Sequence, residues 1–143
     1  IRARSAWIMV DILRKRPVRP ESRLSGITFV PEEKALGNFP ENIEPPEQTD
    51  HKETRDRNVT YSDLDINGHV NNTRYVEWVM DAINPRQILK SLHLRFINEF
   101  LAEETASLHI STIKRGKGFH ISINHKESQK AGCMGFLAFT QPA

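Results

Sequence analysis

The sequence predicts an α+β domain in which one long helix packs on a face of an antiparallel β-sheet. Apolar residues recur three and four apart in a single segment, which ends at Ile83. From about Lys52 onward, one strand-like segment precedes this helical segment and four follow it. Short connections with turn residues separate the later strands, and Arg115–Gly118 is the clearest of them. This order of elements indicates a sheet that carries the helix on one side.

Composition narrows the class of protein. The chain has 143 residues, with 38% hydrophobic and 27% charged residues, which is typical of one soluble globular domain with a core. A net charge of +2 does not favour a nucleic-acid binder. No apolar run approaches the roughly 20 residues of a membrane span, and no signal-peptide pattern is present. Cys133 is the only cysteine and the six histidines lack paired ligand spacing, so we expect no metal and no other cofactor.

The first 52 residues fall outside the predicted domain. Residues 1–23 combine a strand-like run, ARSAWIMVDI, with a basic cluster around two prolines (Arg14, Lys15, Arg16, Arg19 and Arg23). The cluster suits an acidic partner, and it equally suits a solvated turn. Residues 24–52 are predicted to be an acidic, proline-containing linker, which Leu36, Phe39 and Ile43 anchor. Residues 53–143 then form the domain.

The strands of this domain are predicted from local pattern. The expected segments are Thr54–Thr60, Ile88–Phe100, Glu104–Lys114, Phe119–His125 and Lys130–Thr140. The helix begins at an Asn71 or Asn72 cap and ends before the break at Asn84–Pro85. We expect Tyr75 and Trp78 in the core, Cys133 as a buried packing thiol, and Asp63 and Glu77 as a surface turn residue and an ordinary helix residue, respectively.

A dense polar patch precedes the helix and is the candidate site. Asp65, Asn67 and His69 occupy alternate positions, so in an extended segment their side chains project to one side. An ordinary capped turn also uses such residues, but it needs only one of them. The backbone N–H groups that open the helix, at Val70, Asn71 and Asn72, suit a developing oxyanion.

The whole stretch Tyr61–Ile83, YSDLDINGHVNNTRYVEWVMDAI, resembles the signature of acyl-acyl carrier protein thioesterases of the bacterial and plant type. The likeness includes the D-x-N-x-H run, the His-Val-Asn-Asn start and the Arg-Tyr-Val-Glu-Trp helix. It implies a hotdog fold, with a long central helix wrapped by an antiparallel sheet. It further implies that residues 1–23 are the end of a first hotdog repeat and that residues 53–143 are the C-terminal one.

The resemblance implies a function and partners. The implied reaction is hydrolysis of fatty acyl-acyl carrier protein thioesters to a free fatty acid and carrier protein. The implied partners are an acyl carrier protein and a second hotdog repeat, either a first repeat of the same protein or a homodimer mate. The implied compartment is a bacterial cytoplasm rather than a plastid. An acyl channel between helix and sheet is expected, lined by Val76, Phe96, Phe119 and Phe136.

The resemblance also assigns site residues. Asp65, Asn67 and His69 fall on the family's catalytic Asp, Asn and His, and the family's glutamate falls on Glu99. The adjacent cysteine of the plant enzymes is Phe100 here. A histidine titrates near neutral pH and suits a base, while an asparagine can donate to an oxyanion or orient a water.

Glu99 raises a difficulty, and two other functions stay open. Strict alternation from Leu94 turns Glu99 away from the helix, where it would be a solvated partner of Arg95, unless a β-bulge near Ile97–Asn98 turns it inward. The D-x-N-x-H run also resembles hotdog enoyl-thioester hydratases and dehydratases. A non-catalytic hotdog half, which binds acyl chains or only pairs with its partner repeat, is the other alternative.

Overall fold

The computed structural model describes residues 5, 7–11, 13–14, 16–20, 23–24, 26–27, 43–46, 49–86, 88–113 and 118–140. The chain divides into two compact units, Ile1–Glu41 and Asn42–Ala143. In the first unit, β1 (Val10–Asp11) pairs antiparallel with β2 (Arg16–Pro17). The carboxylate of Asp11 accepts the backbone N–H groups of Leu13 and Arg14, which fixes the turn between the two strands.

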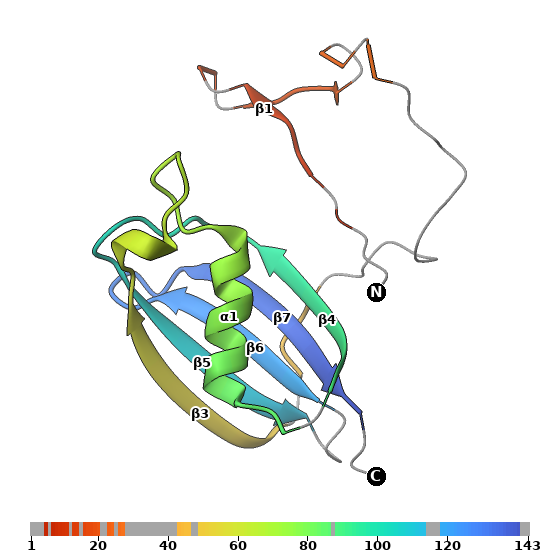
Figure 1. Ribbon diagram of the computed structural model, residues 1–143, viewed down its shortest axis with the longest axis vertical. Coiled ribbons are helices and arrows are strands. Elements are labelled where there is room, and N and C mark those ends of the chain that lie inside the picture. The colour runs from red at the N-terminus through yellow and green to blue at the C-terminus, as the bar shows by residue number, and fades with distance from the viewer. Residues whose placement is uncertain are drawn as a thin grey trace. The chain divides into compact units, whose positions relative to one another are not determined.

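The second unit is a five-stranded antiparallel sheet with one α-helix on its face (Figure 1). The strand order is β3-β5-β6-β7-β4, and these strands are β3 (Thr49–Asn58), β4 (Leu89–Phe96), β5 (Thr105–Ile113), β6 (Phe119–His125) and β7 (Ala131–Phe139). A short 3-10 helix, η2 (Tyr61–Asp63), precedes the α-helix, α1 (Asn72–Ile83). This is the α+β hotdog arrangement that was predicted.

The ends of α1 follow from two asparagines. The carboxamide oxygen of Asn71 accepts the backbone N–H and the hydroxyl of Thr73 at 3.0 and 2.9 Å, so Asn71 is the N-cap, one of the two residues predicted for this position. Asn84 ends the helix in the left-handed conformation, at φ 45°, and donates its N–H to the carbonyl of Met80.

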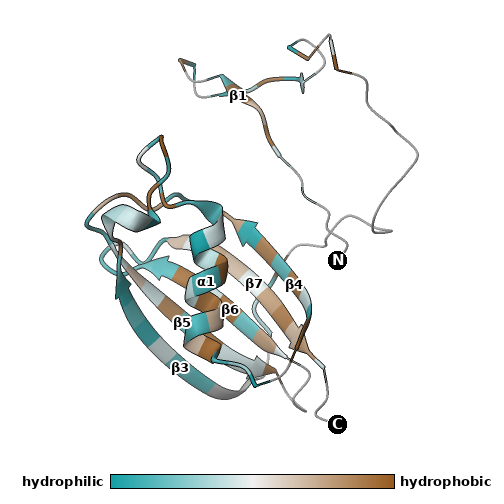
Figure 2. Cartoon of the chain, in the orientation of Figure 1, coloured by the Kyte–Doolittle hydropathy of each residue, from teal (hydrophilic) through white to brown (hydrophobic). Residues whose placement is uncertain are grey.

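The core lies between α1 and the inner face of the sheet. Along β5 and β6 every second side chain faces the helix, and Figure 2 shows the resulting bands of apolar residues. The fully buried side chains include Trp78, Val79, Phe100, Ile121, Ile123, Cys133 and Leu137. Tyr75 and Trp78 therefore lie in the core, as predicted. Cys133 is buried and packs there too, and burial raises the pKa of its thiol to about 12.

Several predicted boundaries differ from the observed ones. β6 has the predicted bounds, but β3 begins at Thr49, ahead of the predicted start at Thr54. Phe136 pairs with His93 and His120 across the outer face of the sheet, so it does not line a channel beneath the helix as expected. Ile43 is buried, whereas Leu36, Phe39 and residues 114–117 lie outside the described residues.

β4 ends at Phe96, before the predicted Phe100, for a reason that matters to the site. The N–H groups of Ile97 and Asn98 both donate to the carbonyl of Gly132, at 2.8 and 3.2 Å. Two consecutive residues opposite one is the pattern of a β-bulge. The alternation of the strand is thereby broken between Phe96 and Glu99, at the place where a bulge was expected.

Candidate active site

The turn that carries Asp65, Asn67 and His69 is built around the Asp65 carboxylate. Its Oδ1 atom accepts the backbone N–H of Asn67 at 2.8 Å and that of His69 at 3.3 Å. The N–H of Asp65 donates to the carbonyl of His69, and Gly68 adopts φ 77°, a conformation that glycine takes without strain. The hydrogen bond from Asn67, together with that from His69, lowers the pKa of Asp65. Asp65 is therefore an ionised residue that shapes the loop.

Backbone contacts bring the loop after β4 against this turn. The N–H of Val70 donates to the carbonyl of Phe100 at 2.9 Å, and His69 forms a β-bridge with Leu101. The bulge at Ile97–Asn98 and this bridge together place Glu99 beside His69. The Nδ1 atom of His69 lies 3.2 Å from the Oε2 atom of Glu99. The His69 side chain is about one-third exposed and that of Glu99 is 70% exposed, so both are open to a ligand.

An open cleft of about 400 Å³ contains this pair. Its lining residues are His69, Asn98, Glu99, Leu101, Glu104, His125, Ser128 and Lys130. Asp65 and Asn67 are not among these lining residues. The side-chain nitrogen of Asn67, Nδ2, lies 3.5 Å from the Oδ2 atom of Asp65. Of the four predicted catalytic side chains, the structure thus brings His69 and Glu99 together in the cleft, with Asp65 and Asn67 in the turn beside it.

The amides at the start of α1 are partly engaged within the fold. The Val70 N–H donates to the carbonyl of Phe100, and the Asn71 N–H donates to the carbonyl of Asp63, both at 2.9 Å. A donor held by a protein carbonyl is not available to a substrate oxygen in the same arrangement. Asn72 is the predicted oxyanion donor that we carry forward.

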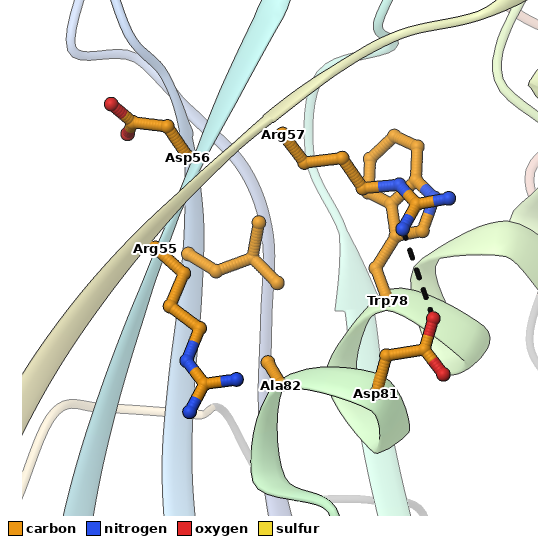
Figure 3. Close-up of a pocket in the computed structure, with 7 residues that line it drawn as sticks. Arg55, Asp56, Arg57, Trp78, Asp81 and Ala82 are labelled. Carbon is orange, nitrogen blue, oxygen red and sulfur yellow. Dashed lines mark ion pairs between the residues drawn. The ribbon is translucent and has the colours of Figure 1, made fainter.

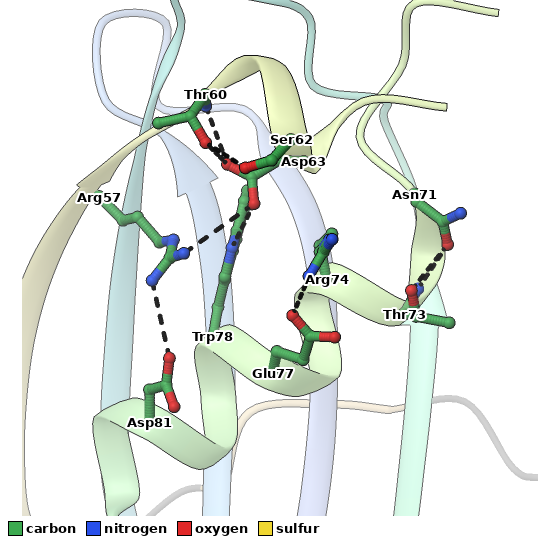
Figure 4. A network of polar contacts seen from close by, with 10 residues as sticks. All are labelled: Arg57, Thr60, Ser62, Asp63, Asn71, Thr73, Arg74, Glu77, Trp78 and Asp81. Atoms are coloured by element: carbon green, nitrogen blue, oxygen red, sulfur yellow. Dashed lines mark hydrogen bonds and ion pairs between the residues drawn. The ribbon is translucent and has the colours of Figure 1, made fainter. Parts of the chain in front are cut away.

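Asp63 differs from its prediction as a surface turn residue, because it is only 2% exposed. Its carboxylate accepts the backbone N–H and the hydroxyl of Thr60 at 2.8 and 2.7 Å and the indole N–H of Trp78 at 3.4 Å (Figure 4). Arg57 lies 3.9 Å away. Burial by itself would raise the pKa of Asp63, but the hydrogen bonds from Thr60 and Trp78 and the charge of Arg57 outweigh it and lower the pKa. Asp63 thus ties the turn to the helix.

A second, smaller hollow of about 200 Å³ lies between β3 and α1 (Figure 3). The Arg57 guanidinium lies 5.3 Å from the ring centre of Trp78 and 3.7 Å from the carboxylate of Asp81. This hollow shares no lining residue with the cleft at His69. Its other charged residues pair with residues outside the hollow, Arg55 with Glu53 and Asp56 with Lys126, so these charges have structural partners.

The sequence-based prediction missed a second histidine–carboxylate pair in the cleft. The Nδ1 atom of His125 lies 3.4 Å from the Oε1 atom of Glu104. One signal was available: His125 continues the alternation of Ile121 and Ile123 along β6, which places it on the helix side of the sheet.

Two further findings concern the described residues as a whole. In that part of the chain, no three His, Cys, Asp or Glu side chains gather in the way a metal ion would require. Its helices also include none with the length and apolar character needed to traverse a bilayer.

The family model and the relatives that match this sequence all concern acyl-acyl carrier protein thioesterases. Residues 46–134 match the family described as "Acyl-ACP thioesterase C-terminal domain". The oleoyl-acyl carrier protein thioesterase 2, chloroplastic, of Arabidopsis thaliana is 34% identical over 108 residues, which are 67% of this chain and 28% of that protein. The oleoyl-acyl carrier protein thioesterase, chloroplastic, of Coriandrum sativum is 32% identical over 108 residues, which again are 67% of this chain and 28% of that protein. The chain therefore spans less than a third of the length of these relatives.

Solved structures show the same fold. An acyl-ACP thioesterase from Bacteroides thetaiotaomicron superposes with a TM-score of 0.68 at 20% identity, covering 92% of this chain and 53% of that one. Thioesterase superfamily member 2 from Mus musculus has a TM-score of 0.56 at 13% identity, covering 62% of this chain and 73% of that one. At these identities the likeness concerns the fold.

Proposed function

Because the chain belongs to the acyl-ACP thioesterase family, through that family's C-terminal domain, we propose that it hydrolyses fatty acyl-acyl carrier protein thioesters. The products are a free fatty acid and the carrier protein thiol. The observation that carries the proposal is the 3.2 Å contact between His69 and Glu99 at the wall of an open cleft. An imidazole held by a carboxylate is a general base that can activate water.

The contact suggests how the proton moves. Because Glu99 faces Nδ1, the neutral ring of His69 carries its proton there and leaves Nε2 as the acceptor. Nε2 takes a proton from a water as the water oxygen attacks the thioester carbonyl, and Glu99 stabilises the imidazolium that forms. The tetrahedral intermediate then collapses, the carbon–sulfur bond breaks, and the thiolate receives the proton from His69.

The neighbouring turn supplies polar support in this scheme. The carboxamide of Asn67 orients the water or the intermediate, and it needs a rotation away from Asp65 to reach the cleft. Asp65 holds the turn, and the Asn72 amide polarises the carbonyl at the start of α1. The acyl tail needs space outside the core, because Trp78 and its neighbours fill the gap between α1 and the sheet.

A second hotdog repeat is the partner we propose for the open side of the sheet. Among the described residues, β4 pairs with β7 alone and is an edge strand. Four apolar side chains at this edge are 43 to 77% exposed: Ile88 just before β4, Phe96 at its end, and Ile97 and Leu101 after it. Unpaired strand edges with exposed apolar side chains favour association. Pairing there would also enclose the cleft and give the acyl tail an apolar wall.

The cellular compartment of the protein is also a proposal. We propose a bacterial cytoplasm, which the resemblance of the sequence implies; the plant relatives are chloroplastic by name, and a plastid is the alternative.

The test is a thioesterase assay with acyl-acyl carrier protein over a panel of chain lengths, alongside the His69→Ala variant. We expect release of free thiol by the wild-type protein and a loss of more than tenfold in His69→Ala, as is usual when a general base is removed. An enoyl-thioester substrate is assayed in parallel. Hydration of that substrate without hydrolysis of the saturated one would overturn the proposal, and so would acyl-thioester binding with no turnover.

A further inference from the structure

The second histidine–carboxylate pair lies in the same cleft as the first. Glu104 and His125 line it together with His69 and Glu99. The side chain of His125 is 13% exposed, and its Nδ1 atom lies 3.4 Å from Glu104 Oε1. The proposed hydrolysis uses neither residue, so their arrangement needs its own explanation.

Glu104 holds the backbone of the segment that carries Glu99 through a hydrogen bond to Leu101. Its other carboxylate oxygen, Oε2, accepts the N–H of Leu101 at 2.7 Å. A hydrogen bond to an ionised carboxylate is roughly twice as strong as one between neutral groups. Leu101 is also the residue that forms the β-bridge with His69. Glu104 therefore holds the residue that joins the loop of Glu99 to the turn of His69.

Phe100, which lies between Glu99 and Leu101, anchors the same segment in the core. Its ring is fully buried and stacks on the imidazole of His125, with ring centres 3.9 Å apart and planes inclined by 11°. Its carbonyl accepts the N–H of Val70, the residue after His69. His125 thus touches both Glu104 and Phe100, and the segment Glu99–Leu101 is held on both sides.

From this arrangement we infer that Glu104 is a positioning residue for the hydrolysis: with His125 it fixes the Glu99–Leu101 segment and so keeps the Glu99 carboxylate on His69. The inference rests on the proposed function. Glu99 is 70% exposed and lies on a loop, so the position of its carboxylate depends on how the Glu99–Leu101 segment is held. Displacement of a catalytic group by about 1 Å costs on the order of a hundredfold in rate.

Three variants of the full chain test this inference kinetically. Glu104→Ala removes the acceptor of the Leu101 N–H. We expect kcat to fall about tenfold or more with KM changed less than about twofold, since the Glu99 carboxylate that would be displaced acts in the transition state. Glu104→Gln keeps an acceptor oxygen and is expected to restore most of kcat. Glu103→Gln is the matched control, because it removes an exposed carboxylate one residue away and should leave both constants unchanged.

A spectroscopic measurement separates this inference from the proposed function. The ¹⁵N resonance of His69 Nδ1 reports its contact with Glu99 and needs no substrate. We expect this resonance to move in Glu104→Ala in the same direction as in Glu99→Ala, and to stay at the wild-type position in Glu103→Gln. A wild-type resonance and wild-type kcat in a folded Glu104→Ala would overturn the inference. A wild-type protein with no hydrolytic activity, together with a resonance that still moves in Glu104→Ala, would overturn the proposed hydrolysis and the catalytic part of the inference, and would support only the structural part, that Glu104 keeps Glu99 on His69.

Discussion

The Nδ1 atom of His69 lies 3.2 Å from the Oε2 atom of Glu99, although one precedes α1 and the other follows β4. The contact exists because the bulge at Ile97–Asn98 reverses the direction in which Glu99 points and the bridge between His69 and Leu101 brings the two segments together. A local irregularity in one strand thereby creates the candidate active site.

Removal of the Glu99 carboxylate is expected to abolish most activity without loss of the fold. Glu99→Ala leaves His69 without its acid partner, so we expect kcat to fall more than about tenfold, while an exposed side chain costs little stability. Steady-state assays with acyl-acyl carrier protein and circular dichroism measure the two effects. Glu77→Ala is the control, because Glu77 is an exposed helix residue paired with Arg74. Near-normal hydrolysis by a folded Glu99→Ala would remove this residue from the scheme.

Gly132→Ala is expected to weaken the support beneath the site. A Cβ atom at this position would lie 2.3 Å from the Cε2 atom of Phe100, which is buried and stacked on His125. Overpacking of this kind costs about 1–3 kcal/mol, and urea denaturation measures the loss in free energy of unfolding. Gly26→Ala is the matched change, since no heavy atom of the described residues, apart from those of Gly26 and its chain neighbours, lies within 4 Å of its Cβ position. Equal stability of the two variants would contradict the packing described here.

Much of the helix and its polar start could be predicted from sequence because their determinants are local. Asn71 caps α1 through a residue two positions away, and Asp65 shapes its turn through Asn67 and His69. The alternation that defines β6 is also local. These features need no knowledge of the tertiary structure.

The features that could not be predicted from the sequence depend on partners that are far away along the chain. In the described part of the chain β3 pairs with β5 alone, and from Lys52 on it carries mostly exposed polar and charged residues, so no apolar alternation marks its start at Thr49. The sequence indicates a surface acid at Asp63 because its partner Trp78 lies 15 residues further along the chain, and only the fold brings the two together. The pair of Glu104 and His125 joins two different strand ends, and no sequence spacing indicates it.

Glu103→Gly is expected to stabilise the protein. Glu103 adopts φ 67°, a left-handed conformation that a side chain with a Cβ atom disfavours and glycine does not. Relief of this strain, offset by the greater freedom of glycine in the unfolded chain, should raise the free energy of unfolding by about 1 kcal/mol or less. Glu103→Ala removes the same carboxylate and keeps the Cβ atom, so it should give no gain. Equal gains in the two variants would assign the effect to charge instead of to backbone conformation.

The buried carboxylate of Asp63 is expected to make stability depend on pH. Because its pKa is lower in the folded state than in the unfolded chain, ionised Asp63 contributes stability above the unfolded value of about 4, and this contribution is lost as the pH falls through the folded value. Asp63→Asn keeps the shape but loses the charge opposite Arg57 and an acceptor for Thr60. We expect the wild type to be more stable than Asp63→Asn at pH 6, and the difference to shrink toward pH 3. Urea denaturation at a series of pH values measures it, and a difference that stays constant with pH would show that Asp63 acts through its hydrogen bonds to Thr60 and not through its charge.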